Sequence, residues 1–408
     1  TPLFDISLDV IRNGGQVLIF TETRKSAVDT GKKTSVVLKS FSKTDKRTLN
    51  AIAERILATG EKTRLSEVLA EQVKLGSAFH HAELTGAHRR VVEDAFRKGA
   101  IKLLAATPTL AAGVNLPART VVISSYERYE AGYGRYPISV LEYKQLSGRA
   151  GRPMYDQFGE AVLVAKSPDE QDYLFENYVL AQPERLWSKL AVERVLRPHV
   201  LATIASGFAR TEKGLYDFFS KTFYAHQYDP RMIRSRIGEI LAFLSKEEMV
   251  KLDGAKLFAT EFGRRVSELY IDPVSGVIIR DALRRKPAYL TDLSLLHMIA
   301  HTPDMGPVLR PYARELDEVS VFMEEHRIEF LVDVPDEWED RITYEQFLGE
   351  IKTAMTLKAW IEEMTEDEII ERFKAQPGDL YRTIENARWL LHATHELALL
   401  FGKREISP

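Results

Sequence analysis

Two arginines three positions apart, Arg149 and Arg152, are the strongest chemical signal in the chain. They lie in residues 145–152, which read Gln-Leu-Ser-Gly-Arg-Ala-Gly-Arg. On a helix, positions i and i+3 share a face, so we expect both guanidiniums to point the same way. Arginines placed in this way can neutralise charge that builds on a γ-phosphate, an effect worth roughly 10³–10⁵ in rate. For an isolated pair, a surface helix with two arginines is the alternative.

Two neighbours extend this candidate site. Gln145, one turn before Arg149, can position water or a phosphate, and Gly148 allows another surface to approach closely. Residues 107–109, Thr-Pro-Thr, directly follow an apolar run. The hydroxyls of Thr107 and Thr109 and the nearby backbone N–H groups can hold sugar and phosphate, contacts that position a strand without reading its sequence.

Strand and helix signals alternate through residues 1–185. Short apolar runs at 16–21, 77–81, 101–106, 119–124 and 160–165 have the length of buried strands. Helical patterns such as 86–97 lie between them. This alternation predicts a parallel sheet wrapped by helices, and the loops at the carboxyl ends of such strands usually carry the chemistry.

The pattern changes after residue 185. Three helical stretches and a small hairpin around 253–254 predict a winged helix in residues 186–271. Residues 272–401 are helical almost throughout. The last helix, from 378–379 to a stop at Gly402, places Arg382, Asn386 and Trp389 on one stripe. Trp389 stands beside two leucines, so from the residues alone it reads as a core side chain, although an Arg and a Trp can also grip a base and a phosphate.

Composition excludes several classes of site. The 408 residues contain no cysteine, so a disulfide framework, a thiolate metal site and a cysteine nucleophile are all excluded. No run approaches the ~18 apolar residues of a membrane span. The net charge is −3, with an acidic stretch at 315–350 and a mildly basic remainder. This distribution is compatible with a protein that has one side facing a polyanion; an acidic solvated surface is the alternative.

Residues 145–152 resemble motif VI of superfamily 2 helicases. Residues 16–27, 78–84 and 106–118 are similar to motifs IV, IVa and V in the right order, with Glu83 where motif IVa usually has Gly. The sequence of residues 113–117, GVNLP, is most similar to that of archaeal Hjm-type DNA helicases of the superkiller-like group, which are relatives of the helicase half of polymerase theta. The resemblance implies an α/β RecA-like motor domain (1–185), a winged helix (186–271) and an all-α ratchet bundle (272–408). Because the family's ratchet helix carries an Arg and a Trp at the spacing of Arg382 and Trp389, the resemblance assigns this pair, with Asn386 on the same face, to DNA binding.

The resemblance also implies roles for individual residues. Gly113 and Asn115 lie where the family couples the nucleotide to the nucleic acid. Residues 126–137, YERYEAGYGRYP, stand where the family has a duplex-splitting hairpin. Their aromatic and basic side chains around a glycine turn can stack on an exposed base pair; an ordinary surface hairpin is the alternative. The candidates there are Tyr129, Tyr133 and Arg135. His80 is left open between a phosphate contact and a strand cap.

Parts of a complete motor are missing from the sequence. Residues 30–34, TGKKT, lack the Ser or Thr and the earlier glycine of a phosphate-cradling loop, and no DExH string is present. The chain opens without Met. We therefore expect a fragment that lacks the first motor domain, which would hold most of the ATP and Mg²⁺, and the family's final helical hairpin.

The resemblance predicts a monomeric 3′-to-5′ DNA helicase in the cytoplasm, associated with the nucleoid, that acts on single-stranded and forked DNA beside replication-fork proteins. An RNA helicase of the same group is one alternative, although residues 271–273 leave no room for the long insertion usual in that group. A strand-binding module without ATPase activity of its own is the other.

Overall fold

The computed structural model describes residues 2–38, 45–60, 62–110, 114–130, 134–152, 156–285, 290–375 and 377–403. They form two compact units, which are described separately. The first comprises Thr1–Arg185 with Gln376–Asp379, and the second comprises Leu186–Ala375 with Leu380–Pro408. The division after residue 185 coincides with the predicted boundary there, whereas a boundary at 271 falls inside the second unit and stays a prediction.

The first unit is built on a five-stranded sheet of order β2-β3-β1-β4-β7, in which every pair is parallel. The strands are β1 (Val17–Phe20), β2 (Ser77–His80), β3 (Leu103–Ala106), β4 (Thr120–Ile123) and β7 (Glu160–Leu163). Each falls within one of the five predicted apolar runs, so the predicted parallel sheet is confirmed. The first four strands are buried along their whole length, as expected of strands covered on both faces.

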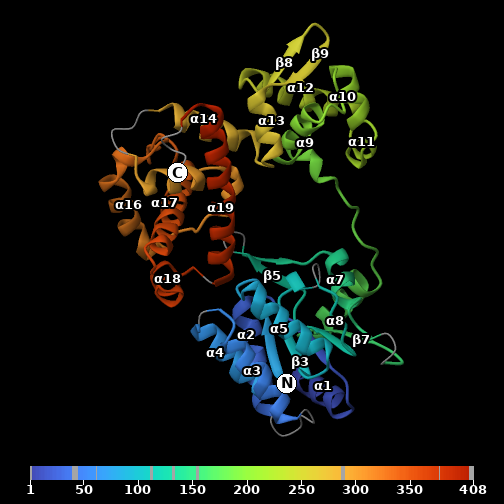
Figure 1. Ribbon diagram of the computed structural model, residues 1–408. Coiled ribbons are helices and arrows are strands. Elements are labelled where there is room, and N and C mark those ends of the chain that lie inside the picture. The colour runs from blue at the N-terminus through green and yellow to red at the C-terminus, as the bar shows by residue number, and fades with distance from the viewer. Residues whose placement is uncertain are drawn as a thin grey trace. The chain divides into compact units, whose positions relative to one another are not determined.

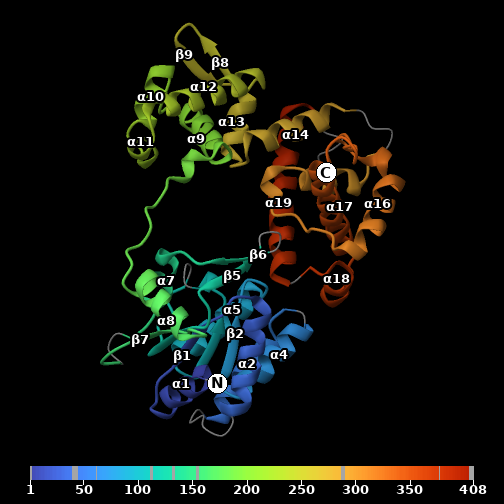
Figure 2. The same ribbon diagram turned by 180° about the vertical axis from the view of Figure 1, so that it is seen from behind.

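Helices cover both faces of this sheet (Figures 1 and 2). They are α1 (Pro2–Arg12), α2 (Arg24–Leu38), α3 (Lys46–Leu57), α4 (Arg64–Lys74), α5 (Gly86–Arg97), α7 (Val140–Ser147) and α8 (Pro168–Leu174). Side-chain caps fix where several of them begin: Thr85 accepts the backbone N–H of His88, and Ser139 accepts that of Glu142. An antiparallel hairpin of β5 (Glu127–Glu130) and β6 (Gly134–Pro137) projects beside the sheet.

The second unit is helical apart from one hairpin. Its first part contains α9 (Glu193–Ala205), α10 (Glu212–Phe219), α11 (Phe223–Gln227), α12 (Pro230–Lys246), the hairpin of β8 (Val250–Asp253) and β9 (Lys256–Ala259), and α13 (Glu261–Glu268). Its second part contains α14 (Pro273–Arg284), α15 (Asp292–Ala300), α16 (Leu316–Glu325), α17 (Arg341–Ile361), α18 (Glu366–Phe373) and most of α19 (Pro377–Leu400). One continuous apolar core joins the two parts.

The last helix ends where the sequence predicts. Gly402 adopts φ +70°, and the backbone N–H of Lys403 donates to the carbonyl of Ala398 over 2.8 Å. This is the left-handed glycine stop that closes many helices. Among the described residues, no helix is both long and apolar enough to cross a membrane, and no cluster of side chains suits a metal ion.

A buried histidine lies in the core of the second unit. The ring of His297 on α15 packs 4.5 Å from that of Phe330 and 4.7 Å from that of Phe347, between ring centroids. Neither ring nitrogen has a hydrogen-bond partner. Burial, with a smaller contribution from nearby His301, lowers the pKa of His297 to about 3. The folded chain therefore keeps this ring neutral.

We predict that His297 makes the second unit sensitive to acid. The unfolded chain binds a proton at this ring below about pH 6.5, whereas the folded chain does not until about pH 3, so stability is complete above pH 6.5 and falls with acidification. Between about pH 7.5 and about pH 5 the loss should be about 2 kcal/mol. His297→Leu should remove that part of the pH dependence.

Urea unfolding followed by tryptophan fluorescence measures this, because all four tryptophans lie in the second unit. His226→Gln, which changes an exposed histidine of the same unit, should keep the full pH dependence. An unchanged pH dependence in His297→Leu would contradict the prediction.

Candidate functional site

The arginine motif lies on a loop and not on a helix. Helix α7 ends before Gly148, the carbonyl of Arg149 accepts the backbone N–H of Ala118 over 3.0 Å, and Gly151 donates to the carbonyl of Ala118 over 2.7 Å. Gly151 has φ +90°, which a residue with a side chain rarely adopts. The prediction that Arg149 and Arg152 share a helical face is therefore wrong, because the glycines end the helix and pair the loop with the segment before β4.

Arg149 contacts a residue of the segment that resembles motif V. Its Nη1 donates to Oδ1 of Asn115 over 3.2 Å. Asn115 is exposed, and Gln145 is exposed one turn earlier on α7. The fold thus brings together Arg149 and Asn115, which the sequence singled out in two separate motifs. Gly113 lies outside the described residues.

Arg152 holds the loop in place. Its Nε and Nη2 donate to the two carboxylate oxygens of Asp156 over 2.7 and 2.8 Å, and its Nη1 donates to Oε1 of Gln16 over 2.7 Å. Gln16 is itself buried and donates to the carbonyls of Phe96 and Ile101. The hydrogen bond from Arg152 lowers the pKa of the Asp156 carboxyl, so the pair stays ionised. Arg152 is therefore bound on three sides, which the sequence did not predict.

The signals for these partners are visible in hindsight. Asp156 follows Arg152 by four residues, and Gln16 is a polar residue at the start of an apolar run. Gly159 is a third residue that sequence reasoning missed. A Cβ atom at Gly159 would lie 2.3 Å from the backbone nitrogen of Gly151 and 2.4 Å from the carbonyl carbon of Ala150. The arginine loop can close against this segment only because residue 159 has no side chain.

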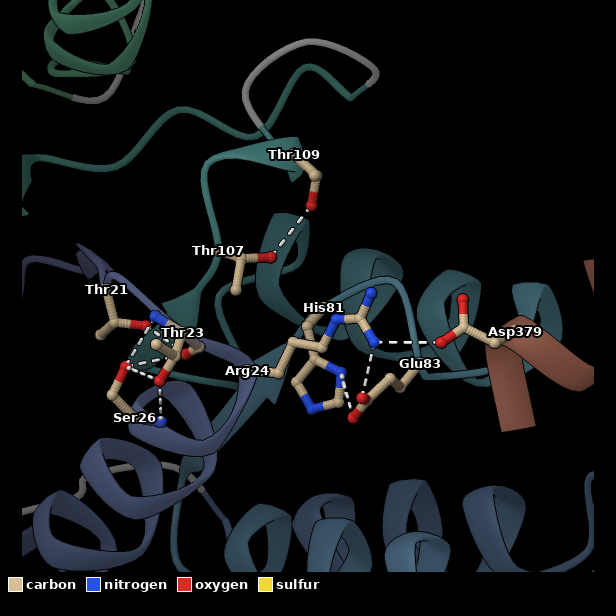
Figure 3. A network of polar contacts seen from close by, with 9 residues as sticks. All are labelled: Thr21, Thr23, Arg24, Ser26, His81, Glu83, Thr107, Thr109 and Asp379. Atoms are coloured by element: carbon tan, nitrogen blue, oxygen red, sulfur yellow. Dashed lines mark hydrogen bonds and ion pairs between the residues drawn. The ribbon is translucent and has the colours of Figure 1, made fainter. Parts of the chain in front are cut away.

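The carboxyl ends of β1, β2 and β3 form an edge lined with hydroxyl groups. Thr21 and Thr23 follow β1, and Thr107 and Thr109 follow β3 (Figure 3). The Oγ1 atoms of Thr107 and Thr109 lie 2.9 Å apart. Ser26 bonds the hydroxyl of Thr23 over 2.9 Å. Thr109 is exposed. Parallel strands end at a common edge, so residues from three motifs that lie far apart in the sequence meet there.

The two histidines at the end of β2 are buried. Nε2 of His80 lies 2.9 Å from the Glu93 carboxylate, and His81 stacks on Phe79 with ring centroids 5.2 Å apart. Burial, then the charges of Arg24 and His80, lower the pKa of His81 to about 3. His80 is only 3% exposed and is already bonded to Glu93, which favours a structural role for this residue over a phosphate contact.

The predicted Tyr-rich hairpin is confirmed as β5 and β6, in which Tyr129 pairs with Arg135. The side chain of Arg135 is exposed, with a nitrogen 3.5 Å from the Glu22 carboxylate. The side chain of Tyr129 and all of Tyr133 lie outside the described residues. The hairpin therefore exists as predicted, and its role stays a prediction.

The stripe on α19 is partly accessible. Arg382, Asn386 and Trp389 are each half-buried. The indole N–H of Trp389 donates to the carbonyl of Leu269 over 3.0 Å, and the ring packs against the core of the second unit. Trp389 is thus anchored in the core, as its leucine neighbours indicate, and also keeps part of its surface exposed, as a contact with a base would require.

Two family models match the chain. Residues 41–154 match the helicase conserved C-terminal domain, and residues 293–408 match the archaeal helicase domain 4. These matches cover more than half of the first unit and the end of the second unit.

Comparison with individual proteins narrows the family. The chain is similar to the protein named ATP-dependent DNA helicase Hel308 in Methanocella arvoryzae (43% identity over 97% of this chain and 53% of the relative), Pyrobaculum calidifontis (39%, 98% and 55%) and Pyrococcus horikoshii (37%, 97% and 54%). The chain spans about half the length of these relatives. It belongs to the Hel308-type group of archaeal superfamily 2 helicases and corresponds to their C-terminal region.

We predict that the arginine loop depends on the close contact at Gly159. Gly159→Ala should displace the loop and lower the stability of the first unit by about 1–3 kcal/mol, because the added methyl group overlaps backbone atoms that cannot rotate away. Thermal unfolding measures the loss. Gly86→Ala, where only flexible arginine ends lie within 4 Å, is the matched control and should leave the midpoint nearly unchanged. Equal midpoints for the two variants would contradict this account.

Proposed function

We propose that this chain is the strand-gripping half of an ATP-driven DNA helicase that moves 3′ to 5′ on single-stranded DNA and opens forked duplexes. The bond between Arg149 and Asn115 carries the proposal, because it joins a phosphate-directed arginine to the motif whose threonines line the strand-facing edge. The printed name of the relatives, a DNA helicase dependent on ATP, supports the same reading.

The proposed nucleotide chemistry uses residues of both motor domains. ATP and Mg²⁺ would be held mainly by a first motor domain, and the bound Mg²⁺ would neutralise part of the phosphate charge. Arg149 then approaches the γ-phosphate and stabilises the charge of the transition state. Gln145 and Gly148 border the same loop. Arg152, bound to Asp156 and Gln16, acts as a positioning residue that holds the loop rigid.

The proposed strand site lies at the hydroxyl-lined edge. Thr109, which is exposed, can donate to a phosphate oxygen, and the hydroxyl of buried Thr107 holds it in position. Such contacts are independent of base sequence and therefore suit a translocating motor. A shift of the Asn115 segment, bonded to Arg149, would pass from the nucleotide side to these threonines along a few residues. The β5–β6 hairpin, with Arg135, would meet the duplex end and separate its strands.

The second unit supplies a second grip in this proposal. The helices α9, α10 and α12 with the β8–β9 hairpin form a winged helix, and Arg382, Asn386 and Trp389 on α19 form a ratchet that contacts bases one after another. The connection from α13 to α14 is only residues 269–272, so it contains no long insertion of the kind usual in the RNA helicases of this superfamily. We therefore favour DNA over RNA as the nucleic acid.

We further propose that the protein acts as a monomer in the cytoplasm, on the nucleoid, beside replication-fork proteins.

A strand-binding module without ATPase activity is the second candidate for this chain alone. Residues 30–34 lie inside α2 and not on a loop between a strand and a helix. A Cβ at Gly31 would lie 2.2 Å from Oε1 of Gln72, so this glycine serves helix packing. Within the described residues we find no loop that cradles phosphates, which supports a nucleotide site completed by another domain.

We predict that Arg149→Ala, in the protein carrying both motor domains, lowers the DNA-stimulated ATPase kcat by about 10³-fold. The transition state loses its positive neighbour while the loop stays anchored by Arg152. Strand affinity measured without nucleotide should change little. Full ATPase activity in this variant would refute the assigned role. Competition of DNA against RNA strands in the same binding assay tests the choice of nucleic acid.

We predict that Trp389→Ala lowers the unwinding rate about tenfold or more and reduces the ATPase rate much less, because a stacking contact worth about 1–3 kcal/mol per base is lost. Trp389→Phe keeps an aromatic face but loses the bond to Leu269 and part of the ring, so it should retain most unwinding. The unfolding midpoints of both variants separate loss of packing from loss of grip. Intact unwinding in a folded Trp389→Ala protein would refute the ratchet assignment.

A further inference from the structure

Arg24 lies between two carboxylates at the hydroxyl-lined edge. Its Nη1 donates to Oε1 of Glu83 over 2.7 Å and to Oδ2 of Asp379 over 3.1 Å (Figure 3). Arg24 opens α2 directly after Thr23, and Glu83 follows β2. The three charged groups therefore occupy the edge at which the proposed strand site lies.

The backbone fixes Asp379 in this position. The N–H of Gly378 donates to the carbonyl of Glu83 over 2.7 Å, and a Cβ at Gly378 would lie 1.8 Å from the carbonyl oxygen of Ala82. Only glycine permits so close an approach. Both Gly378 and Asp379 belong to the first unit, although α19 from Leu380 onward belongs to the second. The carboxylate of Asp379 is thus a built part of this edge.

The group carries two negative charges and one positive charge. Burial raises the pKa of Glu83 and the charge of Asp379 adds to this rise, while the bond from Arg24 opposes it. Burial works to lower the pKa of Arg24, but its bonds to Glu83 and Asp379 raise it above the ordinary value. Arg24 therefore stays charged, and the two carboxylates repel each other across it.

Arg24 still has donors for another ligand. Both bonds end on Nη1, and no bond from Nε or Nη2 to any described residue exists. The side chain is 44% exposed. A guanidinium binds phosphate best through two parallel N–H groups, and the Nε–Nη2 edge offers such a pair. Asp379, 27% exposed, is the more accessible of the two carboxylates and would repel a phosphate approaching that edge.

We propose that Arg24 contacts a phosphate of the bound strand and that Asp379 is an internal competitor for the same guanidinium. Strand binding draws Arg24 from Asp379 to the phosphate, so Asp379 lowers the affinity for nucleic acid and helps the edge to release it. The proposal rests on the proposed function, since it takes this edge to be a strand site. It goes beyond it, because a translocating protein needs contacts that break as readily as they form.

The test measures binding of fluorescent oligothymidine to the 408-residue chain by anisotropy over a range of salt concentrations. Asp379→Asn should tighten binding about 3- to 10-fold at low salt. Arg24→Gln should weaken binding and reduce the slope of log affinity against log salt by about 0.7, the value for one phosphate contact on a single strand. If Asp379→Asn fails to fold, Glu83→Gln serves as a second variant and should also tighten binding.

The double variant Arg24→Gln/Asp379→Asn decides whether the two residues compete. Without Arg24, the Asp379→Asn change should alter affinity by less than about twofold; an equal gain in both backgrounds makes Asp379 a general repulsive charge and overturns the proposal. Asp94→Asn is the matched control. Asp94 also pairs with an arginine, Arg97, but lies in the last turn of α5, at the opposite edge of the sheet, so its loss should leave affinity unchanged.

Failure of the two proposals can be told apart. If the wild-type chain binds no strand, the proposed strand site fails and this inference fails with it. If the wild type binds but neither Asp379→Asn nor Glu83→Gln binds more tightly, only the competition is overturned. If Arg24→Gln leaves both affinity and salt slope unchanged, Arg24 is not a phosphate contact.

Discussion

The common edge of the parallel sheet is the constraint on which the first unit depends. Strands β1, β2 and β3 point the same way, so the residues after each of them converge although they are separated by up to about 90 positions in the sequence. Thr23, Thr107 and Arg24 all lie at this edge (Figure 3). Because the strands are buried and in parallel register, this edge is rigid, and a rigid edge can transmit a small displacement to a bound chain.

The arginine loop is held to the same sheet by a different interaction. Arg152 binds the carboxylate of Asp156 on one side and Gln16 on the other, and Gln16 is tied to the backbone next to β3. An arginine that must act on a phosphate needs a fixed position more than it needs a strong partner. In the arginine loop, Arg152 is held by Asp156 and Gln16, while Arg149 bonds the exposed side chain of Asn115.

The sequence predicted the sheet well because buried parallel strands read as continuous apolar runs bounded by turns. It also predicted the hairpin of β5 and β6 and the end of α19 at Gly402, since local chemistry decides both. It failed where long-range packing decides. The spacing of Arg149 and Arg152 suggested a helix, but Gly148 and Gly151 end it, and the pairing with Ala118 could not be seen from the motif alone.

The same limit explains why the partners of the predicted residues were missed. The role of His80 stayed open in the sequence because its partner Glu93 lies thirteen residues away and only folding places the two side chains 2.9 Å apart. Asp379 lies 355 positions from Arg24, and nothing in its local sequence indicates a contact there. Motifs identify the residues that face a ligand, but they do not identify the residues that hold those side chains before the ligand arrives.

These two kinds of residue have different consequences for a motor. Arg152 makes bonds that satisfy all sides of the guanidinium, so it favours one position of its loop. Arg24 makes its two bonds through one nitrogen, so its Nε–Nη2 edge stays available to another ligand. A site built only from groups of the first kind would bind a strand and keep it. The first unit contains both kinds at opposite edges of its sheet: Arg152 lies beside the amino ends of β1 and β3, and Arg24 lies at the carboxyl ends of β1 and β2. In the proposed motor, the arginine loop would stay fixed while the contact of Arg24 with a strand forms and breaks.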